Sequence, residues 1–345
     1  MKRKQLRIPN HFNPEKVSKI WKVNYQQLAE SARKWSEEYG LTPAIDDKLK
    51  IALVLVDVQN TFCNPDFELF VGGHSGRGAV DDNIRLCEFI YRNLDIITEI
   101  IPTMDTHQAA QIFHSVFLIN EKGEHPKANT LISYDDIKNG VWKINPDVVK
   151  FLGYDEVKAQ EYLVHYTKTL KEKSKYDLII WPYHAMLGGI GHALVPSVEE
   201  SIFFHSIARC SQPDFQIKGR NPLTEHYSVF GPEIRTDADG TKIADKNSSL
   251  IDKLMKYDII IIAGQAKSHC VAWTVDDLLQ EKKDIAKKVY LLEDATSPVV
   301  IPGVIDFTEA ADKAFKKFAD AGMHIVKTSD PIEEWPGIKF QGDLV

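Results

Sequence analysis

Side chains that could do chemistry follow several apolar runs of this sequence. Five predicted strands each end at such a group, and the groups are Asp57, Asp105 with His107, His184, Lys218 and Cys270. In open α/β sheets, ligands bind beyond the carboxyl ends of the strands, so these side chains are expected to meet at one edge. This coincidence is the main reason, from the residues alone, to predict an enzyme.

Cys270 is the candidate nucleophile. Residues 259–262 are four consecutive Ile, typical of a strand buried on both faces, and Gly264 ends the run. Apolar side chains then recur at helical spacing over 271–279, which places Cys270 near a helix N-terminus. There, unpaired N–H groups and the helix dipole lower a thiol pKa and can stabilise an oxyanion. A dyad with His269 is disfavoured because adjacent helical residues point in different directions.

Asp105, His107 and His184 offer one carboxylate and two imidazoles. This ligand set suits zinc, iron or manganese, with positions left for water or substrate. Each candidate group also has an ordinary structural alternative, such as a turn at Asp105, a helix cap at Asp57 or a surface position for Lys218. The joint occurrence of these groups favours a site.

The composition is that of an ordinary globular protein. Of 345 residues, 43% are hydrophobic and 26% charged, and the net charge is −7 with no basic cluster. We therefore expect neither nucleic acid nor a membrane surface as a partner. The four cysteines form no CxxC pair and no apolar leader is found, which favours a reducing, cytoplasmic setting. No nucleotide-binding glycine motif follows the first strand.

Predicted strands and helices alternate along most of the chain. The strands are expected at 51–56, 95–104, 178–181, 215–217, 257–262, 289–292 and 324–327. The helices are expected at 18–39, 80–94, 155–173, 196–209, 271–280 and 307–318. This alternation predicts a doubly wound, Rossmann-like α/β/α fold in three layers, with a mostly parallel sheet of about six strands.

Motifs at the candidate positions resemble those of isochorismatase-like cysteine hydrolases, most closely nicotinamidases. The matching segments are 53–63, Gly72-Gly73, Asp105-Thr106-His107, Trp181-Pro182-Tyr183-His184, Lys218-Gly219 with Tyr227-Ser228-Val229-Phe230, and 264–271. The resemblance implies an isochorismatase-like hydrolase domain over 48–345, preceded by a helical extension at 1–47. An insertion is expected at about 108–177.

The resemblance also implies an activity. It describes a metal-binding cysteine amidohydrolase that cleaves a small amide, such as nicotinamide to nicotinate plus ammonia, through a thioester. Cys270 would attack the carbonyl, Asp57 would take and return the proton, and Lys218 would hold the charges of both. A divalent metal, zinc before iron or manganese, would be bound by Asp105, His107 and His184.

Further site residues are implied in the same way. A cis peptide between Gln265 and Ala266 would direct N–H groups at the oxyanion. Phe62 and Trp181 would form aromatic walls around the substrate. Two positions depart from the nicotinamidase pattern, since Gln111 or His114 stands where a histidine is usual and Ala185 where a cysteine is usual.

Other interpretations stay open. The substrate could be another amide or a ureido compound, whereas the vinyl ether of isochorismate is disfavoured because that reaction does without Cys270. A catalytically silent binding or scaffold protein is a third hypothesis, motivated by the aromatic N-terminal helix and the insertion. We expect a homo-oligomer, and the insertion could lie over the pocket or form a subunit contact.

Overall fold

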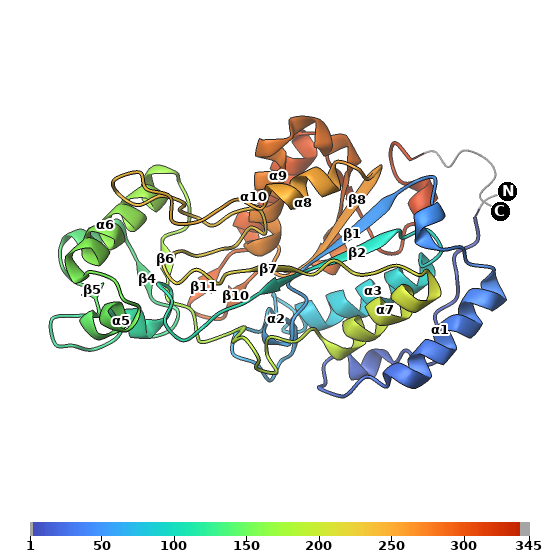
Figure 1. The fold of residues 1–345 in the computed structure, drawn as a ribbon, viewed down its shortest axis with the longest axis horizontal. Coiled ribbons are helices and arrows are strands. Elements are labelled where there is room, and N and C mark those ends of the chain that lie inside the picture. The colour runs from blue at the N-terminus through green and yellow to red at the C-terminus, as the bar shows by residue number, and fades with distance from the viewer. Residues whose placement is uncertain (1–2, 339–345) are drawn as a thin grey trace.

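A six-stranded sheet forms the centre of the computed structural model, which describes residues 3–338 (Figure 1). Its order is β12-β9-β8-β1-β2-β7, and every neighbouring pair is parallel. The strands are β1 (Ile51–Val56), β2 (Glu99–Asp105), β7 (Gln216–Lys218), β8 (Ile259–Gly264), β9 (Val289–Leu292) and β12 (His324–Val326). The predicted doubly wound fold is confirmed.

Helices cover both faces of the sheet. In Figure 1, one side holds α3 (Gly78–Arg92) and α7 (Pro196–Ala208), and the other holds α8 (Ser248–Leu254), α9 (Cys270–Glu281) and α10 (Thr308–Asp320). The N-terminal helix α1 (Tyr25–Tyr39) packs against α7, and the short α2 (Asn60–Cys63) follows β1. No helix within residues 3–338 is long and apolar enough to span a membrane.

The two central strands explain the continuous apolar runs from which they were predicted. Every residue of β1 and β8 is buried, because helices cover both faces of the sheet at these two strands. The strand order reverses between them, since β2 and β7 lie on one side of β1 whereas β9 and β12 lie beyond β8. The carboxyl ends of β1 and β8 therefore frame the crevice where ligands bind in folds of this kind.

Several elements differ from the prediction. Helix α1 begins at Tyr25 rather than at 18, because the side chain of Asn24 caps it by accepting a hydrogen bond from the N–H of Gln27. Strand β6 (Leu178–Ile179), predicted as part of the main sheet, instead pairs antiparallel with β4 (Leu131–Ile132). Helix α8 lies in a stretch for which no element was predicted.

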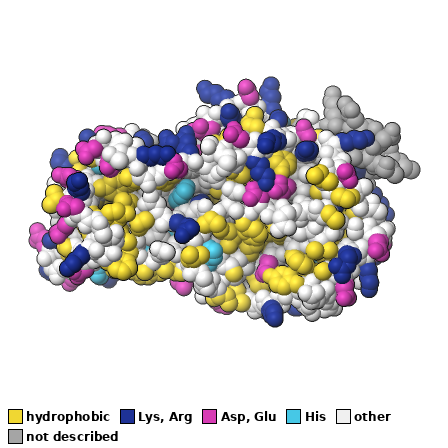
Figure 2. Space-filling view, viewed as in Figure 1, with side chains coloured by type: hydrophobic (Ala, Val, Ile, Leu, Met, Phe, Trp, Pro, Cys, Tyr) yellow, Lys and Arg dark blue, Asp and Glu magenta, His cyan; other side chains and the backbone are white. Residues whose placement is uncertain are grey.

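Residues 108–177 and 219–247 together form what we call the side lobe, at the left of Figure 1. Figure 2, viewed from the same side, shows Lys and Arg side chains interspersed with Asp and Glu over this part of the surface. Its elements are β3 (Leu118–Ile119), β4, α4 (Tyr134–Lys138), β5 (Lys143–Ile144), α5 (Pro146–Phe151) and α6 (Glu156–Glu172). The Tyr162 hydroxyl donates to the carbonyl of Leu223 at 2.8 Å, and His165 Nε2 lies 3.1 Å from the carbonyl of Thr236. The two segments thus pack on each other beside the sheet.

Short elements complete the chain. A hairpin pairs β10 (Val300–Ile301) with β11 (Ile305–Asp306). The 3-10 helices are Pro14–Lys16, Ala44–Asp46, Ser115–Phe117, Lys283–Lys288, Glu293–Ala295 and Ile332–Glu334.

Candidate active site

Four strands of the main sheet deliver candidate groups to one edge. Asp57 directly follows β1, Asp105 ends β2 and Lys218 ends β7. Strand β8 ends at Gly264, and a turn that begins at Gln265 leads to Cys270, the first residue of α9. His184 was expected from a fifth strand of this sheet, but it comes from the loop after β6, outside the sheet. The predicted groups nevertheless meet at the carboxyl edge.

Lys218 connects these groups. Its Nζ atom lies 3.0 Å from Asp57 Oδ2, 3.0 Å from Asp105 Oδ1 and 3.6 Å from Cys270 Sγ. It also donates to the carbonyl of His226 at 2.8 Å. Because all four of these charged or reactive side chains are buried, their interactions are little screened by solvent.

The buried charges change the pKa values of their neighbours. Burial alone would lower the pKa of Lys218, but Asp105 and Asp57 raise it well above its ordinary value. Burial alone would raise the pKa of Asp105, but His107 and Lys218 hold it well below its usual range. For Asp57, burial prevails over the attraction of Lys218 and raises the pKa. Asp105 is therefore the stronger acid of the two, and Asp57 is the weaker one.

Cys270 differs from the expectation of a thiolate. Burial raises the pKa of its thiol well above the ordinary value, against the attraction of Lys218, and a hydrogen bond to Asp57 raises it further. The side chain is 7% exposed, so the favourable effect of the helix N-terminus is outweighed by desolvation. A thiol in this state needs a base to take its proton, and Asp57 is in contact with it.

The turn between β8 and α9 has an unusual backbone. The peptide bond between Gln265 and Ala266 is cis, as the resemblance implied. Gly264 has φ +116°, and a Cβ atom there would lie 2.1 Å from the carbonyl oxygen of Val56, so only glycine fits. The Gln265 amide donates to Asp82 Oδ2 at 2.8 Å, which anchors the turn to α3.

Asp105, His107 and His184 converge as a candidate metal group. All three are buried, and their ligand atoms lie within 4.8 Å of one another. His107 Nε2 lies 2.8 Å from Asp105 Oδ2, and His184 Nε2 lies 3.7 Å from the same oxygen.

The hydrogen bonds of the two imidazoles are compatible with a bound cation. His107 Nδ1 faces the carbonyl of Gly219 at 3.1 Å and His184 Nδ1 faces that of Pro182 at 2.8 Å. A carbonyl oxygen only accepts, so each Nδ1 carries a hydrogen and each Nε2 faces Asp105. Burial lowers the pKa of His184, so its Nε2 presents a lone pair. For His107, burial lowers the pKa but Asp105 raises it more, so its Nε2 holds a proton against that carboxylate. A divalent cation could replace that proton, because both Nε2 atoms and the carboxylate would then be oriented ligands.

Gln111 and His114, the two candidates for the position where nicotinamidases usually carry another histidine, differ in the structure. The Gln111 amide donates to the carbonyl of Gly219 at 2.7 Å, so this side chain supports the loop rather than joining the metal group. The ring of His114 lies beside the metal group, with its centroid 6.0 Å from those of His107 and His184. Burial lowers the pKa of His114 to about 3, so the ring is neutral.

A small cavity of about 30 Å³ joins the nucleophile to the metal group. It is lined by Phe62, Leu69, Val71, Asp105, Trp181, His184, Glu225, Tyr227, Ala266, His269, Cys270 and Val299. Phe62 and Trp181, which the resemblance placed as aromatic walls, are both in this lining. Its walls are mostly apolar with a few polar groups, as is usual for small-molecule sites.

Sequence reasoning missed two side chains of the site. Glu225 lines the cavity, its Oε2 atom is buried without a partner, and burial raises its pKa to about 7. Thr103, inside β2, donates to Asp57 Oδ1 at 2.5 Å. Neither belongs to a recognisable motif, although Thr103 is a polar residue in an otherwise apolar strand, and that signal was available.

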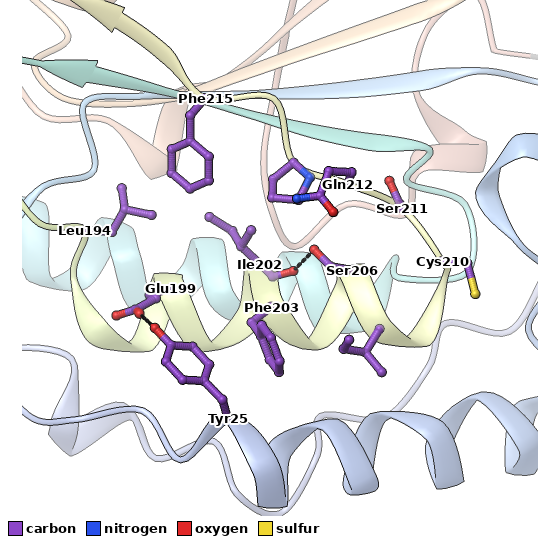
Figure 3. A pocket seen from close by; sticks show the side chains of 12 residues that line it. Tyr25, Leu194, Glu199, Ile202, Phe203, Ser206, Cys210, Ser211, Gln212 and Phe215 are labelled. Atoms are coloured by element: carbon purple, nitrogen blue, oxygen red, sulfur yellow. Dashed lines mark hydrogen bonds between the residues drawn. The ribbon is translucent and has the colours of Figure 1, made fainter.

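A larger groove lies elsewhere, between α7 and the segment that leads into β7 (Figure 3). Its volume is about 450 Å³ and its walls include Phe203 and Phe215. Two of the polar groups drawn there are already paired, since Tyr25 bonds to Glu199 and Ser206 donates to the carbonyl of Ile202. No candidate catalytic group lines this groove, so the smaller cavity is the candidate active site.

Known proteins were compared with the chain. No family model matches it, and no curated protein matches it. The solved structures that match include a nicotinamidase from Acinetobacter baumanii, with 18% identity over 82% of this chain and 99% of that one, and a TM-score of 0.45. The yeast nicotinamidase has 19% identity over 80% of this chain and 99% of its own, and a TM-score of 0.48.

A pyrazinamidase from Pyrococcus horikoshii, solved in complex with zinc, also matches. It has 17% identity, covers 81% of this chain and 99% of its own, and has a TM-score of 0.40. These matching structures are nicotinamidases and pyrazinamidases, the group that the sequence motifs resemble. Because the identities and TM-scores are low, we base the functional proposal on the residues of this chain.

Proposed function

We propose that this protein is a metal-binding cysteine amidohydrolase that cleaves a small aromatic amide, with nicotinamide as the first candidate. The observation that carries the proposal is the contact of one buried lysine, Lys218, with both Asp57 and Cys270, next to the metal group. A general base, a nucleophile and a fixed positive charge are the parts that covalent amide hydrolysis needs.

The chemistry follows from the protonation states. The Cys270 thiol gives its proton to Asp57 as sulfur attacks the amide carbonyl, because burial raises the thiol pKa and favours the protonated form at rest. The tetrahedral intermediate expels ammonia when Asp57 returns the proton to the leaving nitrogen. Water, deprotonated by Asp57, then attacks the thioester. Asp57 returns this proton to the departing sulfur, which restores the thiol and the ionised Asp57, and the acid product loses its own proton to solvent to give the carboxylate. Lys218 balances the negative charge at each stage.

The metal group would bind the substrate next to the nucleophile. When bound by Asp105, His107 and His184, a divalent ion supplies a Lewis acid that can orient a ring nitrogen or another donor atom. Zinc is our first candidate, because two imidazoles and one carboxylate with open positions form a typical zinc ligand set. Phe62 and Trp181 would hold the flat ring of the substrate.

The proposal is tested by ammonia release from a panel of small amides that includes nicotinamide. The metal content of the same preparation, purified without chelator, is measured in parallel. We expect release that is lost in Cys270→Ala and kept in Cys210→Ala, a matched change at an exposed cysteine. A Cys270→Ala protein that retained most of the turnover would contradict the covalent mechanism.

A different substrate of the same chemistry is the second candidate. The free Oε2 atom of Glu225 in the cavity favours an amide or ureido compound that carries an additional hydrogen-bonding group. Faster release from such compounds than from nicotinamide would favour this candidate. Release from none of them would favour a catalytically silent protein.

A further inference from the structure

The insertion at 108–177 does not line the cavity but reaches the turn that carries the nucleophile. Tyr176 follows α6, and its hydroxyl donates to the carbonyl of Ser268 at 3.0 Å. Ser268 lies two residues before Cys270 in the chain. A side chain of the side lobe is thus hydrogen-bonded to the backbone that positions the thiol.

The ring of Tyr176 adds a second contact with the same turn. Its centroid lies 4.9 Å from that of His269 and 5.5 Å from that of Trp273, on the first turn of α9. It also lies 4.9 Å from the ring of Phe307. Burial raises the pKa of the Tyr176 hydroxyl to about 12, so the group is a neutral donor at any physiological pH.

The neighbouring residue fixes the end of the insertion in place. The Lys175 ammonium lies 5.0 Å from the ring centroid of Trp273 and forms an ion pair with the buried Glu233. Tyr176 is therefore held from both sides, by α9 and by the second segment of the side lobe. A hydroxyl anchored in this way restricts the movement of the carbonyl that it binds.

We propose that Tyr176 is a positioning residue, through which the side lobe holds the Ser268–Cys270 turn in the geometry that brings the thiol to Lys218 and Asp57. The inference rests on the proposed function for its effect on turnover. Its effect on the turn itself is independent of any substrate.

The test compares Tyr176→Phe with Tyr290→Phe. Both changes remove one tyrosine hydroxyl that donates to a backbone carbonyl, since Tyr290 donates to Pro336 at 2.6 Å, and both keep the ring. In Tyr176→Phe we expect kcat for the best amide to fall about three- to tenfold, with KM nearly unchanged, because the lost bond holds the nucleophile rather than the substrate. Hydrogen exchange of the amides in 266–272 should become faster.

Tyr290→Phe should change neither kcat nor exchange in this segment, even if both variants lose similar thermal stability. If Tyr176→Phe kept the wild-type kcat and the wild-type exchange rate, the inference would be wrong. If the wild-type protein hydrolysed no amide, the proposed function would fail. The role of Tyr176 would then be judged by exchange alone: faster exchange of 266–272 in Tyr176→Phe would support it, and unchanged exchange would refute it.

Discussion

The Nζ atom of Lys218 lies 3.6 Å from the Sγ atom of Cys270, although Lys218 ends strand β7 and Cys270 begins helix α9, with 51 residues of chain between them. The same Nζ lies 3.0 Å from Asp57. Because the thiol is buried and its pKa is raised, this cation is the group that lowers the cost of forming a thiolate during attack.

Replacing Lys218 with Met should nearly abolish turnover. The buried carboxylates of Asp57 and Asp105 would lose their shared counter-charge, so we expect kcat/KM to fall on the order of 10²-fold or more. The measurement is ammonia release by the purified variant. Lys317→Met, which removes a mostly exposed partner of Asp276, is the control and should keep activity. Comparable loss in both would argue against a role for Lys218 in the chemistry.

Thr103→Val should shift the pH profile. The Thr103 hydroxyl donates to Asp57 Oδ1, a bond that favours the ionised carboxyl, so its loss should raise the Asp57 pKa further. Asp57 must be ionised to accept the thiol proton. The acidic limb of kcat/KM should therefore move to higher pH.

Thr98→Val is a matched control for that experiment. Thr98 accepts from the N–H of Ile51 and donates to Asp47, just as Thr103 accepts from the N–H of Asp57 and donates to its carboxyl. Both variants should lose similar stability, whereas the acidic limb should stay in place in Thr98→Val. An unmoved limb in Thr103→Val would exclude Asp57 as the group that sets it.

Gly219→Ala should weaken metal binding. Gly219 has φ +87°, and an added Cβ would lie 2.7 Å from Asp105 Oδ1 and 2.8 Å from His107 Cε1. Gly240 has a similar φ, +81°, but no atom lies within 4 Å of its added Cβ. Both variants share the backbone strain, so a loss of metal content in Gly219→Ala alone would assign the effect to the ligands. Equal metal content in the two would contradict the metal assignment.

His205 should make the fold less stable in mild acid. Its Nε2 donates to the carbonyl of Ile97, and burial lowers its pKa to about 4. The unfolded chain, with an ordinary histidine pKa, binds this proton first, so stability is full above pH 6.5 and falls as the pH drops toward 4. The expected loss is roughly 2 kcal/mol between pH 6.5 and pH 5.

Urea unfolding at several pH values measures this loss. His205→Gln keeps an N–H donor without the titration, so its unfolding free energy should depend less on pH than that of the wild type. His74→Gln, at an exposed histidine, should leave the wild-type dependence unchanged. An identical pH dependence in all three proteins would place the acid sensitivity at other groups.

The strands that the sequence predicted most clearly are those covered by other elements on both faces of the sheet. Strands β1 and β8 are continuous apolar runs because both of their faces are covered, and this pattern needs no partner to be recognised. Leu178–Ile179 has a similar local pattern, yet it pairs with Leu131–Ile132 of the insertion. Two apolar residues do not specify which strand they will join.

The site was predictable to the extent that strand ends determine it. Asp57, Asp105 and Lys218 converge because parallel strands end at one edge. Glu225 was missed because it lies in an irregular segment whose place depends on the side lobe, where its N–H donates to the Tyr166 hydroxyl. The thiol pKa was predicted in the wrong direction, because a local helix terminus was outweighed by burial, which depends on the whole fold.

The pairing of the two side-lobe segments has a consequence for synthesis on the ribosome. Residues 108–177 leave the exit tunnel well before 219–247, so the face of α6 that carries Tyr162 and Tyr166 is exposed to water until the later segment arrives. Helical segments can form early, but this lobe can close only after Lys218 has been translated. During that interval the nascent chain is therefore most open to binding by chaperones or to misassembly with another copy. Transplanting one segment without the other would leave this face of α6 permanently exposed.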